Sequence, residues 1–101
     1  MFPEGTGKPN PRGLDFYDRL IDELLKQGIE PYATLYHWDL PQALEDKGGW
    51  ARRETAYHFA DYAQEVARRF GDRAASLTPH NEPWCTAFLG NYHGAFAPGY
   101  R

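Results

Sequence analysis

The stretch IEPYATLY, residues 29–36, decides the fold of this chain. It is short, apolar and rich in β-forming residues, and its apolar and polar residues do not alternate cleanly. A strand with one face in water shows that alternation, whereas a strand covered on both faces, as in a parallel sheet, does not. The stretch therefore predicts a buried parallel strand over residues 29–36.

An amphipathic helix is predicted before this strand, over residues 11–27. Asn10 is a favourable N-cap, and Pro11 suits the first helical position because its φ angle is already helical. Gly28 suits the end of the helix. The apolar residues recur at helical spacing and predict the buried stripe: Leu14, Tyr17, Ile21, Leu24 and Leu25.

A turn-rich loop over residues 39–50 and a second helix over residues 52–70 are predicted after the strand. The buried stripe of this helix is expected to comprise Phe59, Ala63, Val66 and Phe70. A second strand is predicted over residues 74–81. Its end at Glu82 fits because Pro83 restricts the preceding residue to extended geometry.

The predicted order is helix, strand, helix, strand, which is typical of a parallel α/β architecture. The connections are long enough for right-handed crossovers, so we expect two adjacent parallel strands. This pattern by itself does not separate an open sheet from a closed barrel.

Composition excludes several classes of partner. The net charge is −3, with acidic and basic residues interspersed, which argues against binding nucleic acid or an anionic membrane. No stretch approaches the apolar length of a membrane span. Cys85 is the only cysteine, so no intrachain disulfide is expected, and the first residues lack the features of a signal peptide. A cytoplasmic location is therefore expected.

Polar and aromatic side chains follow both predicted strands: HWD at residues 37–39 and NEPW at residues 81–84. Reactive side chains of parallel α/β folds gather at the carboxyl ends of the strands, so these two groups should share one rim. Imidazole, amide and carboxylate groups beside an aromatic platform match the hydroxyls and apolar C–H faces of a sugar. Glu82 is the candidate general acid.

Each of these features also has a simpler interpretation. A Glu-Pro pair in a loop is usually a solvated turn, and His37 with Trp38 is often aromatic packing at a strand end. Asp39 is expected to tie its loop by hydrogen bonds. The histidines and Cys85 have no recognised metal spacing and no phosphate-binding glycine motif occurs, so we expect neither a metal nor a cofactor.

Taken together, the motifs of this chain resemble glycoside hydrolase family 1, the family of β-glucosidases and 6-phospho-β-glucosidases. The YHWDLP and NEP runs are together highly specific for that family. The runs that carry the resemblance are FPEGTG (residues 2–7), GLDFY (13–17), LYHWDLPQ (35–42), GGW (48–50), RFGDR (69–73), NEPW (81–84) and APG (97–99).

The resemblance implies a retaining glycosidase on a (β/α)8 TIM barrel, acting on a small-molecule or oligosaccharide β-glycoside. By the matching motifs, Glu82 would be the general acid/base and Asn81 would hold the sugar hydroxyl next to the anomeric carbon. His37 and Trp38 would line the same glycone site, and Trp84 would face the leaving group.

The resemblance also implies that part of the site is missing. In the family the nucleophilic carboxylate lies on a later strand, within a threonine-glutamate-asparagine-glycine type motif, and here no Asp or Glu follows Glu82. A whole barrel needs about 250 residues. Residues 1–101 are therefore expected to form a partial catalytic barrel of about two βα units, in the third and fourth strand region.

Three residues depart from the family pattern. Leu77 stands where tryptophan is usual, Pro79 where threonine is common, and Phe96 where histidine is frequent. Proline inside a strand removes a hydrogen-bond donor, so Pro79 is expected to disturb the second strand locally.

Three interpretations stay open: a fragment of an enzyme, a module that binds sugar without cleaving it, and a purely structural folding unit. The missing nucleophile favours the last two for the isolated chain, whereas the intact Asn81–Glu82 pair favours the first for its origin. Two strands leave sheet edges and helix faces uncovered, so we expect the chain to need the rest of a barrel or to self-associate.

Overall fold

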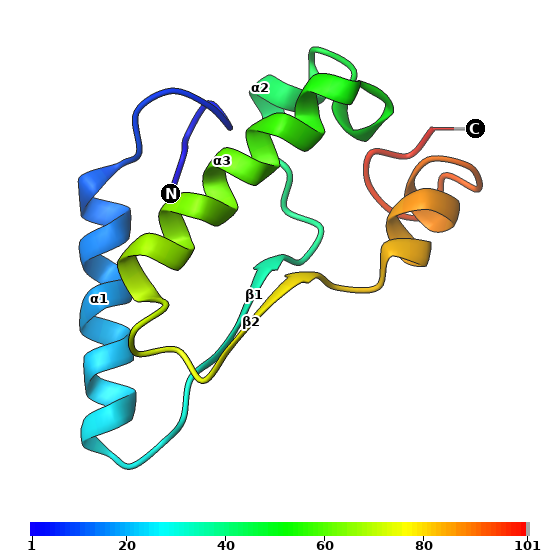
Figure 1. Cartoon of the computed structure of the whole chain (residues 1–101). Helices are drawn as coiled ribbons and strands as arrows, with labels where there is room; N and C mark the ends of the chain where they lie inside the picture. Colours follow the sequence, from blue (N-terminus) through cyan, green and yellow to red (C-terminus); the bar gives the residue numbers. More distant parts are fainter. Residues whose placement is uncertain (101) are drawn as a thin grey trace.

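Two parallel strands lie side by side in the structure, a computed structural model that describes residues 1–100. β1 (Tyr32–Tyr36) pairs with β2 (Ser76–His80), in a register that runs from the Tyr32–Ser76 pair to the Tyr36–His80 pair. Figure 1 shows both strands pointing the same way. The predicted pair of adjacent parallel strands is therefore confirmed.

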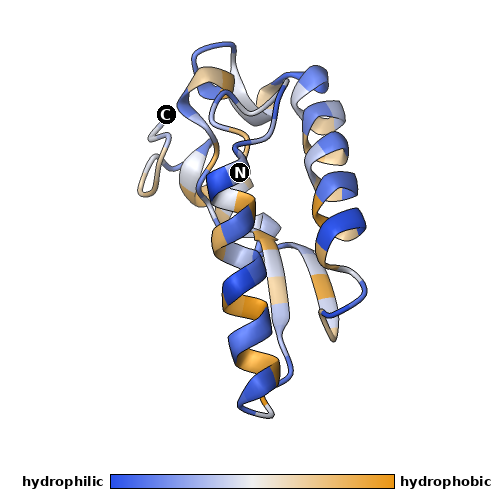
Figure 2. Ribbon diagram, turned by 90° about the vertical axis from the view of Figure 1, so that its left-hand side faces the viewer, coloured by the Kyte–Doolittle hydropathy of each residue, from blue (hydrophilic) through white to orange (hydrophobic). Residues whose placement is uncertain are grey.

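Two long helices flank this sheet. α1 (Pro11–Lys26) precedes β1, and α3 (Arg53–Phe70) lies in the crossover from β1 to β2. Their bounds agree with the predicted ranges to within one residue at each end. Figure 2 shows hydrophilic and hydrophobic residues interleaved along both helices, as expected for helices that pack through one face. Across residues 1–100, no helix has the length and apolar character needed to cross a bilayer.

Local chemistry sets the helix ends. The Asn10 side chain accepts a hydrogen bond from the Arg12 backbone N–H at 3.1 Å, as an N-cap does. Gly28 has φ of +73°, a left-handed conformation that glycine adopts without steric cost. Gly71 ends α3 for another reason: its φ is −63°, but a Cβ there would clash with the carbonyl oxygen of Ala67.

Both strands are shorter than predicted. β1 begins three residues late because the Ile29 N–H donates to the Leu24 carbonyl at 2.9 Å, so Ile29 takes part in the turn that closes α1 and is not free to pair in the sheet. β2 covers residues 76–80 instead of 74–81. The register pairs pass over Pro79 and resume at His80, the local disturbance expected of a residue without a backbone N–H.

Three short helical segments were not predicted. α2 (Gln42–Glu45) lies inside the predicted loop, a 3-10 turn (Gly49–Ala51) lies at its end, and a helical segment (Cys85–Gly90) follows the second strand. Each has six residues or fewer, too short for a recognisable apolar stripe.

The hydrophobic core joins both helices to one face of the sheet. Leu35 of β1 and Leu77 of β2 pack against it. Thr34 and Thr78 lie on the opposite face, because successive side chains of a strand alternate, and both are exposed. That face of the sheet is therefore uncovered at Thr34 and Thr78, whereas Tyr36, further along the same face, is buried against Trp50. The buried core residues are Leu14 and Ile21 of α1 and Val66 and Phe70 of α3.

A network of ion pairs joins α1 to the end of α3. Arg73, just beyond α3, contacts Asp18 at 2.6 Å and Asp22 at 2.7 Å. Arg69 contacts Asp15 at 2.9 Å and shares Asp18 with Arg73. The carboxylates lie three or four residues apart on α1, and therefore on one helix face. The network fixes the two helices against each other.

Candidate active-site rim

The four predicted site residues lie at one end of the sheet. His37 and Trp38 follow β1 directly, and Asn81 and Glu82 follow β2 directly. The strands are parallel and their last residues, Tyr36 and His80, pair with each other, so the residues that follow both strands lie at the same end of the sheet. Figure 1 shows the two strands ending side by side at this rim.

Two hydrogen bonds tie the two turns of the rim together. The Trp38 indole N–H donates to the Asn81 carbonyl oxygen at 3.0 Å. The Asn81 backbone N–H donates to the Tyr36 carbonyl oxygen at 2.9 Å, one step beyond the last pair of the register. The His37 ring lies against the Trp38 ring, with centroids 5.1 Å apart. The rim is thus a connected unit, although its parts come from positions 43 residues apart.

Two residues of the rim have left-handed backbone conformations. Trp38 has φ of +73° and Glu82 has φ of +43°, and they are the non-glycine residues with positive φ among residues 1–100. Such a conformation costs about 1–2 kcal/mol for a residue with a Cβ atom. Strained residues of this kind gather at functional sites, where the surrounding structure holds them.

The conformation of Glu82 corrects one prediction. An extended Glu82 was expected because it precedes Pro83, and instead its φ is positive. The helical turns that follow supply the reason, because the Cys85 backbone N–H donates to the Glu82 carbonyl at 2.9 Å. The chain therefore turns sharply at Glu82 and does not run on from β2.

Asp39 has the role expected of it. Its carboxylate accepts a hydrogen bond from the His37 backbone N–H at 3.1 Å, which closes a tight turn after β1. Aspartate side chains commonly stabilise turns by hydrogen bonds to nearby backbone groups. Asp39 is thus an anchor of the loop that presents His37 and Trp38.

Aromatic side chains also lie next to the rim. Trp84 is 55% exposed and stacks on Phe88, with centroids 5.3 Å apart and an interplanar angle of 18°. Phe96, at the position where histidine is frequent in the resembling family, has its centroid 5.3 Å from that of Trp38. An exposed indole face of this kind is suited to the apolar face of a sugar or an aryl group.

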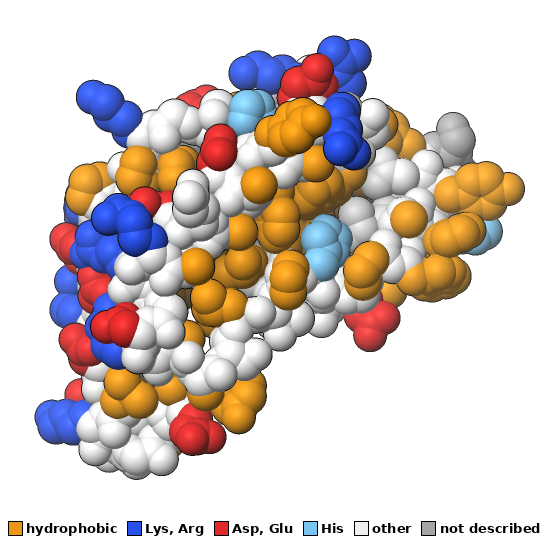
Figure 3. Space-filling model, in the orientation of Figure 1, with side chains coloured by type: hydrophobic (Ala, Val, Ile, Leu, Met, Phe, Trp, Pro, Cys, Tyr) orange, Lys and Arg blue, Asp and Glu red, His pale blue; other side chains and the backbone are white. Residues whose placement is uncertain are grey.

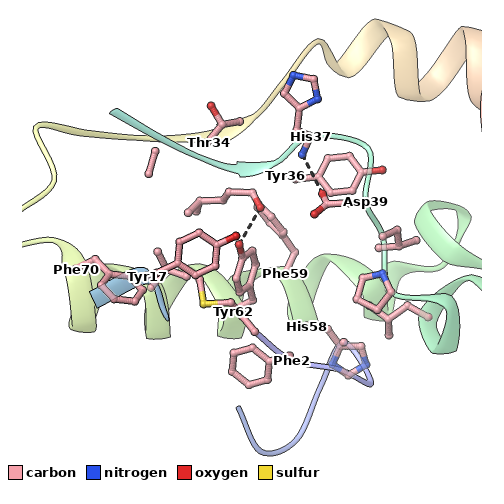
Figure 4. A pocket seen from close by; sticks show the side chains of 18 of the residues that line it. Phe2, Tyr17, Thr34, Tyr36, His37, Asp39, His58, Phe59, Tyr62 and Phe70 are labelled. Atoms are coloured by element: carbon pink, nitrogen blue, oxygen red, sulfur yellow. Dashed lines mark hydrogen bonds between the residues drawn. The ribbon is translucent and has the colours of Figure 1, made fainter. Parts of the chain in front are cut away.

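A hollow of about 450 Å³ lies between β1 and the two long helices. Figure 3 shows hydrophobic side chains gathered along it, and Figure 4 shows Tyr17, Phe59 and Tyr62 beneath β1. The Tyr62 hydroxyl donates to the Leu35 carbonyl at 2.9 Å, and burial raises the pKa of this tyrosine to about 12. Residues of β1 line this hollow, and residues of β2 do not.

The four predicted site residues do not all line the same hollow. His37 lines the large hollow, whereas Trp38 lines a smaller one with Tyr36, Thr86 and Phe96. Asn81 and Glu82 line neither of these two. A single cleft shared by all four residues was expected, and these hollows do not confirm it. No group of three or more potential metal ligands occurs among residues 1–100.

Sequence reasoning missed an aromatic cluster beneath the rim. The Tyr36 ring lies 4.5 Å from the His80 ring and 5.1 Å from the Trp50 ring, and Phe59 completes the cluster. Burial lowers the pKa of His80, which favours the neutral imidazole. The position of His80, one residue before Asn81, was the available signal that it lies under the site.

Comparisons with known proteins agree on one relationship. The family model described as glycosyl hydrolase family 1 matches residues 1–101. The chain is 64% identical over 95 residues to thermostable beta-glucosidase B of Thermobispora bispora, covering 94% of this chain and 20% of that protein. It is 54% identical over 101 residues to beta-glucosidase A of Thermotoga maritima, covering 100% of this chain and 23% of that protein.

Solved structures give the same result. A beta-glucosidase from Thermotoga maritima in complex with deoxynojirimycin superposes with a TM-score of 0.97 at 53% identity, over 100% of this chain and 23% of that one. A second solved structure, of a beta-glucosidase from the same organism in complex with galacto-hydroximolactam, has the same TM-score, identity and coverage. This chain spans about a fifth to a quarter of the length of the relatives it matches. The fold is thus that of part of a TIM barrel.

Proposed function

Because this chain belongs to glycosyl hydrolase family 1, we propose that it supplies the acid/base side of a retaining β-glycosidase active site. The observation that carries the proposal is the place of Asn81 and Glu82, directly after β2 and beside His37 and Trp38 after β1. The carboxyl ends of barrel strands are where catalytic residues of TIM-barrel enzymes lie.

In this proposal Glu82 acts twice. It first protonates the glycosidic oxygen as the bond from that oxygen to the anomeric carbon breaks, while a carboxylate from another strand bonds to the anomeric carbon. Glu82 then takes a proton from water, whose oxygen displaces the carboxylate and releases the sugar with its β configuration retained. The second carboxylate lies about 5–5.5 Å from the first in retaining enzymes, and this chain does not supply it.

The other rim residues bind the sugar. Asn81 holds the hydroxyl next to the anomeric carbon, and His37 and Trp38 line the glycone site. Trp84, which is exposed and stacked on Phe88, faces the leaving group. The substrate is a small-molecule or oligosaccharide β-glucoside, in keeping with the relatives described as beta-glucosidases.

The uncovered surfaces support a role as part of a larger barrel. Thr34 and Thr78 are exposed on one face of the sheet, and β1, which also lines the apolar hollow, has one unpaired edge. In a complete barrel, neighbouring strands pair with such edges, and side chains from alternate strands fill the interior. The alternative function is a sugar-binding or structural module without catalysis, which the lack of a nucleophile favours for the isolated chain.

A graft into a complete barrel tests the proposal. Beta-glucosidase A of Thermotoga maritima aligns with all 101 residues, so this chain can replace the matching stretch of that enzyme. We expect the graft to hydrolyse an aryl β-glucoside, and its Glu82→Gln variant to lose about 100-fold or more in kcat. Glu30→Gln, the same change at an exposed glutamate before β1, is the matched control and should retain activity.

Three results are distinguishable. Turnover that depends on Glu82 supports the proposal. A folded graft that binds a glucoside without turnover favours the sugar-binding alternative, and one that neither binds nor turns over favours the structural alternative. The isolated chain should show no turnover, because it has only one of the two carboxylates.

A further inference from the structure

The rim contains a contact whose geometry points beyond sugar binding. We propose that Trp38 is a positioning residue for Glu82, acting through the hydrogen bond from its indole N–H to the Asn81 carbonyl. This inference rests on the proposed function, because it assigns to Trp38 a part in proton transfer by Glu82. The role is separate from any contact of the Trp38 ring with the sugar.

The hydrogen bond acts on the backbone directly before Glu82. The Asn81 carbonyl belongs to the peptide group that joins Asn81 to Glu82. The Trp38 indole N–H donates to the oxygen of that peptide group at 3.0 Å. The N–H of the preceding peptide group, which joins His80 to Asn81, donates to the Tyr36 carbonyl at 2.9 Å. The two peptide groups that precede Glu82 are therefore both held by hydrogen bonds to the turn after β1 or to its last residue.

Glu82 needs such support because its backbone is strained. Its φ of +43° is disfavoured for a residue with a Cβ atom, and a strained residue persists only where its surroundings hold it. The Cys85 N–H holds the Glu82 carbonyl from the other side at 2.9 Å. Without the hydrogen bond from Trp38, the backbone before Glu82 would lose its support, and the carboxyl group of Glu82 could move.

Trp38 is itself held firmly enough to act as a support. Its own φ is +73°, the Asp39 carboxylate closes the turn that contains it, and its ring packs against the rings of His37 and Phe96. Its side chain is 37% exposed, so one part of the ring stays open to a ligand. The same indole can thus present a face to the sugar and an N–H to the Asn81 carbonyl.

Leaving groups of different acidity separate a positioning role from a binding or structural one. An alkyl or unactivated aryl β-glucoside needs its glycosidic oxygen protonated as the bond breaks, whereas dinitrophenolate departs without a proton. A misplaced general acid therefore slows the first substrate and spares the second. Loss of a sugar contact or of folded protein slows both substrates equally.

The test uses the graft of this chain in the Thermotoga maritima barrel. Trp38 is replaced by phenylalanine, and in a second variant by benzothienylalanine, which has the shape of tryptophan with sulfur in place of the N–H group. We measure kcat/KM, which reports the formation of the glycosyl-enzyme, on phenyl and dinitrophenyl β-glucosides. Trp50→Phe, at the aromatic cluster beneath the rim, is the matched control.

The proposal predicts that both Trp38 variants lose on the order of 10- to 100-fold on the phenyl glucoside and much less on the dinitrophenyl glucoside. The Trp50→Phe control should leave the ratio of the two rates unchanged. Equal losses on both substrates in the benzothienylalanine variant, or no loss on either, would overturn the positioning role while leaving the proposed function intact. A graft whose turnover does not depend on Glu82 would overturn both.

Discussion

The guanidinium group of Arg73 lies 2.6 Å from the carboxylate of Asp18, a contact between positions 55 residues apart. Arg69 binds the same carboxylate, so Asp18 is the centre of the network that joins α1 to the end of α3. Both helices belong to the unit that carries β2 and the rim after it. The network therefore joins the helix before β1 to the segment that leads into β2.

Replacement of Asp18 by asparagine should destabilise the chain. The variant removes the charge that two guanidinium groups share, and the side chain is only 24% exposed, so solvent screens the loss in part. We expect the free energy of unfolding to fall by about 1–2 kcal/mol. Urea unfolding followed by circular dichroism measures this, with Asp61→Asn, at an exposed aspartate of α3 outside the network, as control.

The contribution of Asp18 should depend on pH. Hydrogen bonds from Arg73, followed by those from Arg69, lower its pKa in the folded state below the usual 3.8. The stabilisation is therefore fully present above the unfolded pKa and is lost as the pH falls through the lower folded value. The difference in stability between the native chain and Asp18→Asn should shrink below about pH 4. A difference that grows under acid would contradict this assignment.

Tyr62 should stabilise the chain through one hydrogen bond. Its hydroxyl donates to the Leu35 carbonyl at 2.9 Å, and burial raises its pKa to about 12. Tyr62→Phe should lower the free energy of unfolding by about 1 kcal/mol, whereas Tyr57→Phe, at an exposed tyrosine of α3, should have little effect. Because the folded pKa is raised, this stabilisation is present below about pH 10 and is lost as the pH rises toward 12.

The isolated chain should associate in solution. One edge of β1 and the part of the sheet face with Thr34 and Thr78 are uncovered, and such surfaces pair with other chains. Light scattering should give a mass above the 11.6 kDa of a single chain. Tyr32→Lys, at a residue of β1 that is 70% exposed, should weaken the association, and Tyr92→Lys, at an equally exposed residue after β2, should not. A native chain that stays monomeric at high concentration would refute this expectation.

Elements with local signals could be predicted from the sequence. The start of α1 depends on Asn10 and Pro11, which act within one turn, so its prediction held to the residue. The shared rim could also be predicted, because parallel strands end at the same edge whatever their side chains. The predicted strand ends were less accurate, because the beginning of β1 depends on a hydrogen bond from the Ile29 N–H to the Leu24 carbonyl of α1.

The details of the site could not be predicted in the same way. The contact of Trp38 with the Asn81 carbonyl joins positions 43 residues apart, and no local pattern encodes it. The positive φ of Glu82 contradicts the preference of a residue before proline, and only the helical turns from Cys85 onward account for it. Sequence thus located the rim, and tertiary contacts determined its geometry.

The stereochemistry of azide rescue tests the role of Glu82 most directly. In the graft, a Glu82→Ala variant is given dinitrophenyl β-glucoside and sodium azide, and the glucosyl azide formed is identified by NMR. If Glu82 is the acid/base, the glycosyl-enzyme still forms on the other carboxylate, and azide attacks the anomeric carbon from the face that Glu82 has vacated. The account predicts β-glucosyl azide. Formation of α-glucosyl azide would make Glu82 the nucleophile, and the absence of any azide product would remove it from the reaction.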